Sequence, residues 1–389
     1  MRALSLLTSL LALLPTAIST QEPLLASAHN HNVSAALFSE LEELARLVDI
    51  TYCIGSPAPG ITPPFNCLSR CSGFPRFSLV TTWNTGPLLS DSCGYIALDH
   101  GKERIVVAFR GTYSIANTVV DLSTIPQEYT PFPGTNEGDE PKCHNCTVHA
   151  GFQTSWTHTR KEILVDLETQ LKLWPHYSLH LVGHSLGGAV AGLAGLDLLA
   201  RGYDPTITTF GEPRLGNQGL VNYIDARFQL KPKRGQRDMD GLHYRRVTHI
   251  DDPIPLLPLT EWGFAMHAGE IFITNPSLSP DIADLRHCIG DNDKDCIAGQ
   301  DSTIETKGQV PQPHKRDLRS SVLEEVHDVV HEPWGIPSRY KLWQLFFAHR
   351  DYFWRLGLCV PGGDPLGGGR KHGAIDGFEE AKSLKDEMK

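Results

Sequence analysis

Short apolar runs and helical repeats alternate through the middle of the chain. Runs rich in β-branched residues predict strands, and segments whose apolar residues recur every three to four positions predict helices. The predicted strands are Arg104–Phe109, Ser178–Val182, Thr206–Phe210, Tyr244–Ile250 and Glu270–Thr274. The predicted helices are Ser34–Leu47, Phe152–Leu173, Gly188–Ala200 and Asn217–Phe228. This alternation predicts an α/β fold around a mostly parallel central sheet with helices on both faces.

An apolar stretch near the N-terminus is typical of a secretory signal peptide. It runs from Ala3 to Leu14 behind Arg2, and small residues suited to cleavage follow it, so we expect a signal over residues 1–19. A membrane anchor needs roughly 20 apolar residues, which this run does not reach. The sequence therefore predicts a secreted, extracellular protein without a transmembrane anchor.

A single domain is expected over residues 20–359. Within it, Asp301–Gly335 is polar and contains prolines, which is typical of an insertion. Residues 360–389 are first Gly-rich and then charged and poor in aromatic residues. Such a composition cannot bury an apolar core, so we expect a disordered tail there.

Composition and charge exclude several classes of protein. With 40% hydrophobic residues in a chain of 389, the protein is long enough to bury a large core. The 35 basic residues are outnumbered by 45 acidic ones, for a formal net charge of −10. Such a surface does not attract phosphate backbones in general, so nucleic acid is not an expected partner. No pattern indicates a cofactor or an obligatory protein partner.

Nine cysteines lie beyond the predicted signal, in a protein expected to reach an oxidising compartment, so disulfides are the default. Three pairs are close in sequence: Cys67 with Cys71, Cys143 with Cys146, and Cys288 with Cys296. A zinc site would need a second C-x-x-C besides that of the middle pair, and none follows, so no metal is predicted. Of Cys53, Cys93 and Cys359, one must stay outside an intramolecular disulfide, and spacing does not choose it.

Two N-x-S/T sequons, at Asn32 and Asn145, predict glycosylation of a secreted chain. The middle residue of the second sequon is Cys146, which a disulfide would hold. A disulfide at Cys146 would constrain the backbone of the second sequon, which makes Asn145 the less suitable acceptor. No cysteine lies in the sequon of Asn32.

Ser185 lies in the pentapeptide GHSLG at 183–187, between the predicted strand Ser178–Val182 and the predicted helix Gly188–Ala200. This setting is that of a nucleophile elbow, in which a strained tight turn lifts a serine above the sheet. Glycines flank the serine because a side chain there would run into the neighbouring strand and helix. The helix start also directs backbone N–H groups toward a developing oxyanion. We predict a nucleophile at Ser185, against the alternative of a plain glycine-rich corner.

A serine hydroxyl reacts only with a base beside it, and the base needs an orienting carboxylate. In this fold the acid follows the serine in the chain and the histidine comes last. Asp251 and Asp252 follow the predicted strand Tyr244–Ile250, at a carboxyl end where such sheets assemble their sites. Adjacent residues point opposite ways, so only one acid faces the site, and spacing does not choose between them.

The base must come from the histidines downstream of these acids. They are His267, His287, His314, His327, His331, His349 and His372. Most lie in unsuitable settings: the expected tail, the insertion, a cysteine loop, or the start of a predicted strand. His327 and His331 have the i, i+4 spacing of a metal pair, but the glutamate and third ligand are missing. His349 lies in an aromatic segment before the last cysteine, where a structural role and a catalytic role are both compatible with the residues.

The turn Arg110–Thr112 follows the predicted strand that ends at Phe109. The second oxyanion donor in these folds comes from a loop of this kind, so Thr112 and the N–H of Leu186 are the predicted donors.

Ile115, Val119 and Leu122 recur at i, i+4 and i+7 after this turn, which predicts a short amphipathic helix. One interpretation is an ordinary surface helix. The other is a hinged lid whose apolar face covers the serine when closed and contacts a lipid surface when open.

Taken together, these segments resemble the fungal secreted triacylglycerol lipases of lipase class 3 and their feruloyl esterase relatives. The likeness covers roughly Ser34–Cys359, and five segments carry it in the family's order: 108–112, 148–152, 183–187, 210–217 and 267–270. The region of Tyr52 to Cys67 looks most similar to secreted yeast lipases. The resemblance implies an α/β-hydrolase fold with a short lid helix.

Carried over residue by residue, the resemblance implies a catalytic triad of Ser185, Asp252 and His349, with oxyanion donors at Thr112 and Leu186. It thereby selects the second of the two adjacent acids. It also implies four disulfides: Cys53–Cys359, Cys67–Cys71, Cys143–Cys146 and Cys288–Cys296. The thiol of Cys93 is then the odd one.

The predicted function is that of a secreted serine hydrolase that cleaves carboxylic esters through an acyl-enzyme intermediate. Triacylglycerol at a lipid–water interface is the expected substrate, with transient contact through the lid. One alternative is a feruloyl or general carboxylesterase. Its flap is typically more polar, so the apolar residues Ile115, Val119 and Leu122 favour the lipase. Another is a catalytically inactive secreted binding protein.

Overall fold

The computed structural model describes residues 31–55, 59–86, 92–112, 126–131, 142–231, 239–302 and 347–365. Internal contacts divide the chain after Asn30, and all of these residues belong to the second unit, His31–Lys389. The predicted signal peptide, the predicted lid residues, most of the predicted insertion and the end of the predicted tail lie outside the described residues.

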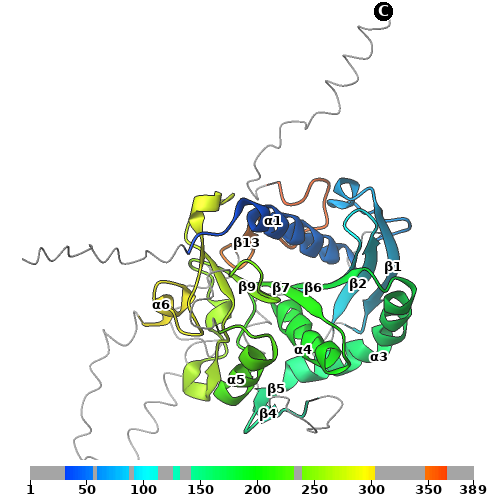
Figure 1. The fold of residues 1–389 in the computed structure, drawn as a ribbon. Coiled ribbons are helices and arrows are strands. Elements are labelled where there is room, and N and C mark those ends of the chain that lie inside the picture. The colour runs from blue at the N-terminus through cyan, green and yellow to red at the C-terminus, as the bar shows by residue number, and fades with distance from the viewer. Residues whose placement is uncertain are drawn as a thin grey trace, which may run out of the picture. The chain divides into compact units, whose positions relative to one another are not determined.

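A sheet of eight strands forms the centre of these ranges (Figure 1). Its strands are β1 (Phe77–Asn84), β2 (Cys93–Asp99), β3 (Arg104–Phe109), β6 (Ser178–His184), β7 (Pro205–Phe210), β9 (Tyr244–His249), β11 (Glu270–Ile273) and β12 (Leu285–His287). They pair in this order, with parallel neighbours from β3 to β11 and antiparallel pairings at both edges. The predicted α/β architecture with a mostly parallel sheet is confirmed.

Helices cover both faces of this sheet (Figure 1). On one side, α1 (Ala35–Ile50) packs against β3, β6 and β7, and on the other α4 (Leu186–Ala200) packs against the same strands. Beside α4 lies α3 (Ala150–Leu173), and α5 (Gln218–Arg227) belongs to the same core. No helix in the described ranges is both long enough and apolar enough to cross a bilayer.

The strand β3 shows why its sequence reads as a continuous apolar run. Ile105, Val107 and Phe109 belong to the core shared with α4, whereas Val106 and Ala108 belong to the core shared with α1. Because both faces are covered, every residue of the strand is buried. The parallel strands on either side of the candidate nucleophile are therefore fixed by apolar packing on two sides.

The remaining elements are short. A second sheet pairs β4 (Pro126–Glu128), β5 (Thr147–His149), β8 (Gly216–Asn217) and β10 (Phe264–Ala265). Near the end of the described residues lie α6 (Ile297–Ser302) and a hairpin of β13 (Asp351–Tyr352) and β14 (Trp354–Arg355). Single 3-10 turns lie at Thr51–Cys53, Cys71–Gly73, Ile254–Leu256, Thr260–Trp262 and Ile282–Asp284.

The antiparallel strands β1, β2 and β12 were not predicted from the sequence. In the edge strand β1 only two of the eight positions are buried, and a bulge between Leu79 and Thr81 interrupts its alternation. Strand propensity depends on the neighbours that a strand meets in the fold, so such an edge gives a weak local signal. The expectation that His267 opens a strand was also wrong, since β11 begins at Glu270.

The structure contains four disulfides, in the pairs that the resemblance implies: Cys53–Cys359, Cys67–Cys71, Cys143–Cys146 and Cys288–Cys296. The ninth cysteine, Cys93, lies outside them, and its buried thiol donates to Asn84 Oδ1 at 3.0 Å.

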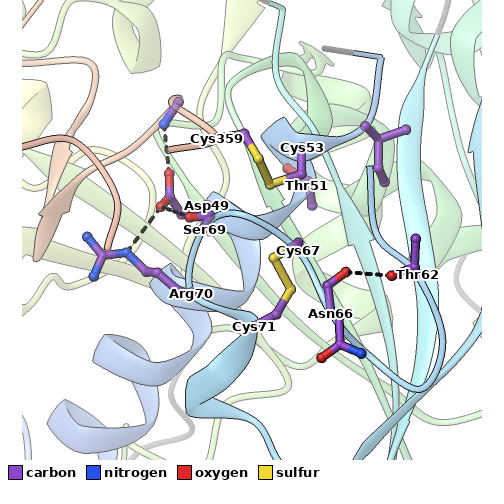
Figure 2. Close-up of a disulfide and its surroundings, with 12 residues drawn as sticks. Asp49, Thr51, Cys53, Thr62, Asn66, Cys67, Ser69, Arg70, Cys71 and Cys359 are labelled. Atoms are coloured by element: carbon purple, nitrogen blue, oxygen red, sulfur yellow. Dashed lines mark hydrogen bonds and ion pairs between the residues drawn. A yellow bond between two sulfur atoms is a disulfide. The ribbon is translucent and has the colours of Figure 1, made fainter. Parts of the chain in front are cut away.

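The first of these disulfides joins the 3-10 turn after α1 to the C-terminal segment 347–365 (Figure 2). Beside it, the carboxylate of Asp49 accepts the backbone N–H of Gly357 at 2.9 Å. The side chains of Ser69 and Arg70 donate to the same carboxylate at 3.2 and 3.1 Å (Figure 2). A covalent bond and a buried carboxylate thus hold this segment, which carries His349, against α1.

Candidate active site

Ser185 lies on a sharp turn between β6 and α4. Its backbone has φ 57° and ψ −128°, a strained conformation for a residue with a side chain. The strain is held from two sides: the N–H of Ser185 donates to the carbonyl of Phe210 at 2.9 Å, and its carbonyl accepts the N–H of Gly188 at 2.9 Å. Such fixation is what keeps an unfavourable backbone in place.

The glycines that flank this turn are required by close backbone contacts. A Cβ at Gly183 would lie 2.2 Å from the carbonyl oxygen of Gly187. A Cβ at Gly187 would lie 2.5 Å from the carbonyl oxygen of Phe109 at the end of β3. Both distances are impossible for real atoms, so the crowding that the sequence pattern implies is present on both sides of Ser185.

His349 and Asp252 form a buried pair. Asp252 follows β9, and Nδ1 of His349 lies 3.0 Å from each of its carboxylate oxygens. Asp251, the alternative acid, is exposed. Two other candidate histidines in the described ranges contact acids elsewhere, since His267 bonds Glu212 and His287 bonds Asp240. Of the predicted residues, the structure thus brings His349 together with the second of the two acids.

Two further donors hold the Asp252 carboxylate. The N–H of Ile254 donates to Oδ1 at 2.9 Å, and the hydroxyl of Tyr352 donates to Oδ2. Burial raises the pKa of Asp252, but the charge and hydrogen bond of His349, with these two donors, bring it below its ordinary value. Burial and the neighbouring carboxylate raise the pKa of Tyr352 well above its ordinary value, so its hydroxyl remains a donor.

Two buried polar atoms at this site have no hydrogen-bond partner among the described residues: Nε2 of His349 and Oγ1 of Thr112. These two atoms are the ones that a general base and an oxyanion donor must keep available for the serine hydroxyl and the substrate. The Ser185 hydroxyl is therefore not bonded to Nε2 here. Catalytic hydrogen bonds are often long before a substrate binds, so this geometry is compatible with proton transfer.

The predicted oxyanion donors lie on the two segments that adjoin the Ser185 turn. Leu186 is the first residue of α4, so its N–H has no acceptor within the helix. Thr112 follows Gly111, whose backbone is so close to the turn that a Cβ there would lie 2.9 Å from Cβ of Ser185.

Four residues around the candidate triad were not predicted from the sequence: His184, Gly211 and Tyr352 contact it directly, and Tyr52 contacts His184. The ring of His184 stacks on that of His349, with centroids 4.7 Å apart, and Tyr52 bonds His184. His184 and Gly211 lie inside two of the five segments that carry the resemblance, whereas Tyr52 and Tyr352 lie outside them. Nothing in the spacing of the four residues indicated that they meet.

The structure describes the two predicted glycosylation sites but not the predicted lid residues. Asn32 and Asn145 are both exposed, so glycosylation of either stays a prediction. Ile115, Val119 and Leu122 lie outside the described residues, and so the lid also stays a prediction. A cavity of about 490 Å³, bordered by residues that include Arg214 and Asp301, contains none of the predicted site residues in its lining.

A serine on a strained strand-to-helix turn, with a buried Asp–His pair from later in the chain, defines the class of α/β-hydrolases. Residues 106–262 match the family model described as Lipase (class 3). The chain is 52% identical to "Secreted mono- and diacylglycerol lipase 2" of Gibberella zeae, over 94% of this chain and 93% of the relative. It is 51% identical to "Lipase A" of Sodiomyces alcalophilus, over 91% and 90%.

Among solved structures, the Lip2 lipase of Yarrowia lipolytica matches with a TM-score of 0.67 and 28% identity, over 85% of this chain and 97% of that one. The protein therefore belongs to the class 3 lipase family and has the α/β-hydrolase fold. It is a lipase-type hydrolase of carboxylic esters. The predicted secreted location is confirmed by relatives that are named as secreted proteins.

Proposed function

We propose that Ser185, His349 and Asp252 form the catalytic triad of a lipase that cleaves acylglycerol esters through an acyl-enzyme intermediate. One observation carries the proposal. The buried imidazole is held at Nδ1 by Asp252, while its Nε2 is unpartnered within the described residues and the neighbouring His184 leads directly into the strained turn of Ser185. That is the arrangement a general base needs.

In this mechanism the Ser185 oxygen attacks the ester carbonyl while Nε2 of His349 takes the hydroxyl proton. Asp252 holds the ring in the Nδ1–H tautomer and stabilises the imidazolium. The N–H groups of Leu186 and Thr112 and the Thr112 hydroxyl receive the oxyanion. The imidazolium protonates the departing glycerol oxygen, and a water molecule, activated in the same way, then releases the fatty acid from the serine.

The low pKa of Asp252 supports its role. The carboxylate must stay ionised while the adjacent imidazole becomes a cation, and three donors surround it. Tyr352 and the N–H of Ile254 therefore do for Asp252 what Asp252 does for His349: they fix its position and favour its charged form.

The names of the relatives support the proposed substrate class. Relatives from Gibberella zeae, Penicillium cyclopium and Penicillium camembertii are named as mono- and diacylglycerol lipases, which favours partial glycerides over the triacylglycerol expected from sequence. Contact with a lipid surface through Ile115, Val119 and Leu122 rests on their sequence pattern alone.

The chemistry is tested with Ser185→Ala on a p-nitrophenyl ester and with a fluorophosphonate probe. We expect the variant to fold like the wild type, to hydrolyse at background rate, and to escape labelling. Retained turnover in a folded variant would reject Ser185 as the nucleophile, and an unlabelled, inactive wild type would favour the binding-protein alternative.

The substrate is tested separately, with emulsified diacylglycerol, triacylglycerol and methyl ferulate at matched ester concentrations. We expect diacylglycerol to be cleaved fastest. Faster cleavage of triacylglycerol would restore the sequence-based expectation, and cleavage of ferulate alone would identify an esterase.

A further inference from the structure

His184 connects the candidate nucleophile to the candidate base through the backbone. It is the last residue of β6 and directly precedes Ser185. Its Nε2 lies 2.8 Å from the backbone carbonyl oxygen of His349, 165 residues away in sequence. A carbonyl oxygen only accepts, so Nε2 of His184 must carry the proton.

The other nitrogen of His184 is equally well defined. Its Nδ1 lies 2.6 Å from the hydroxyl of Tyr52. In the neutral ring this nitrogen is an acceptor, so Tyr52 donates to it. Burial, and next the charge at His349, lower the pKa of His184 to about 3, which agrees with a neutral ring.

Tyr52 also reaches the predicted oxyanion loop. The backbone N–H of Gly111 hydrogen-bonds the Tyr52 hydroxyl, and a Cβ at Gly111 would lie 2.6 Å from that oxygen. Burial raises the pKa of Tyr52, so the hydroxyl keeps its proton and acts as donor and acceptor at once. A continuous chain of hydrogen bonds thus runs from Gly111 through Tyr52 and His184 to His349.

We infer that Tyr52 and His184 are positioning residues that set the base, the nucleophile turn and the oxyanion loop at fixed distances from one another. This inference rests on the proposed function. Asp252 holds one edge of the His349 ring, while His184 holds its backbone and stacks on its face at an interplanar angle of 29°. With edge, face and backbone fixed, Nε2 of His349 keeps one direction.

The neutral state of His184 is part of this role. The reaction makes an imidazolium at His349, and a second cation stacked on it would oppose that charge. The groups that act on His184 are Tyr52 from the turn after α1, His349 and Arg350 from the C-terminal segment, and Asp252 from the loop after β9. Tyr52, as donor to Nδ1, keeps the proton on the nitrogen that faces the carbonyl.

A purely structural role for the same contacts makes a different prediction. If Tyr52 and His184 only stabilised the core, their loss would lower the folded fraction but leave the turnover of each folded molecule unchanged. If they position the base, kcat falls in fully folded protein. KM stays the same, because neither residue contacts the substrate in the proposed mechanism.

The test compares Tyr52→Phe, His184→Leu and His184→Gln with Tyr95→Phe as the matched control. Tyr95 is a buried tyrosine whose hydroxyl donates to the carbonyl of Leu47 in α1 at 2.8 Å, and not to a residue of the candidate site. We expect kcat to fall about 3- to 10-fold in Tyr52→Phe, the loss of one hydrogen bond. A displaced base should cost about 10²-fold in His184→Leu.

His184→Gln supplies the conservative rescue, because its amide nitrogen can donate to the His349 carbonyl and its oxygen can accept from Tyr52. We expect it to recover most of the kcat that His184→Leu loses, whereas Tyr95→Phe should keep wild-type kcat. If Tyr52→Phe keeps wild-type kcat, or loses no more than Tyr95→Phe at equal folded fraction, the inference is wrong. The comparison of Tyr52→Phe with Tyr95→Phe tests the inference even if His184→Leu does not fold.

A spectroscopic measurement tests the tautomer without using activity. In protein labelled with 15N-histidine, we expect His184 to give the signals of a neutral Nε2–H ring between pH 5 and 8, with the Nδ1 signal shifted in Tyr52→Phe. A protonated ring or an Nδ1–H tautomer in this range would overturn the inference. Ser185→Ala, assayed in parallel, keeps the two questions apart: if it retains turnover the proposed function fails, whatever the tautomer of His184.

Discussion

The backbone of Gly211 lies against the ring of His349. A Cβ at residue 211 would lie 2.9 Å from Cε1 of that ring and 3.0 Å from Oδ2 of Asp252. Gly211 also has φ 62°, a conformation that residues with a side chain rarely adopt. The end of β7 therefore touches the contact between acid and base and leaves no room for a methyl group.

Gly211→Ala should consequently displace His349 or Asp252 rather than merely strain the backbone. We expect kcat on a p-nitrophenyl ester to fall about 10²-fold or more, since displacements near 1 Å have effects of that size. Gly202→Ala is the matched control, because Gly202 has φ 89° but no atom within 4 Å of its Cβ position. The control shares the cost of the backbone conformation without the clash. Equal activity of the two variants would show that the close approach has no catalytic consequence.

Substitutions of Asp252 and Tyr352 should lower kcat by different amounts, because Asp252 orients the base directly and Tyr352 acts through Asp252. Asp252→Asn should lower kcat by about 10⁴, because the amide stabilises the wrong tautomer of the base. Tyr352→Phe removes only one donor to the carboxylate, and we expect a loss of about 10-fold, the scale of a hydrogen bond to a charged group. The measurement is kcat in protein shown to be folded by circular dichroism. A larger loss in Tyr352→Phe than in Asp252→Asn would contradict the assignment of Asp252 as the orienting acid.

The parts of this architecture that could be predicted from sequence are those with local causes. Strand β3 was predictable because both of its faces are buried, and Ser185 because the glycines that crowd its turn lie within two residues of it. Asp252 could not be separated from Asp251 by spacing. Asp251 takes a left-handed backbone conformation, with φ 68°, so the strand alternation no longer applies at that point.

His349 is the opposite case. Its position depends on contacts between segments that are more than 300 residues apart: the disulfide Cys53–Cys359 and the bond from Gly357 to Asp49. Local periodicity cannot encode such contacts, so only the resemblance to known lipases separated this histidine from the others. The same reason hides Tyr52, whose neighbours in sequence give no sign that its hydroxyl reaches His184.

The buried, neutral histidine beside Ser185 gives the folded protein a defined weakness in acid. The pKa of His184 is about 3 in the native state, whereas a histidine in an unfolded chain titrates near about 6.5. Between these values the unfolded state binds more protons, so this contribution is complete above about pH 6.5 and is lost as the pH falls toward 3. Burial lowers the pKa of His180 in the same direction, to about 4.

Other buried groups titrate as well, so the contribution of His184 is isolated by the difference in the free energy of unfolding between the wild type and a His184 variant. Burial raises the pKa of Asp49 and of Glu270. Protonation of these two carboxyls therefore stabilises the native state relative to the unfolded state as the pH falls. His184→Gln removes only the titrating ring. We expect the free energy of unfolding of wild type minus that of this variant to fall by up to about 1.4 kcal/mol per pH unit below pH 6.5. Urea unfolding followed by tryptophan fluorescence at pH 7, 6, 5 and 4 measures it. The corresponding difference for Tyr95→Phe should stay flat, because neither side chain titrates there; a flat difference for His184→Gln would mean that the ring is already protonated in the native protein.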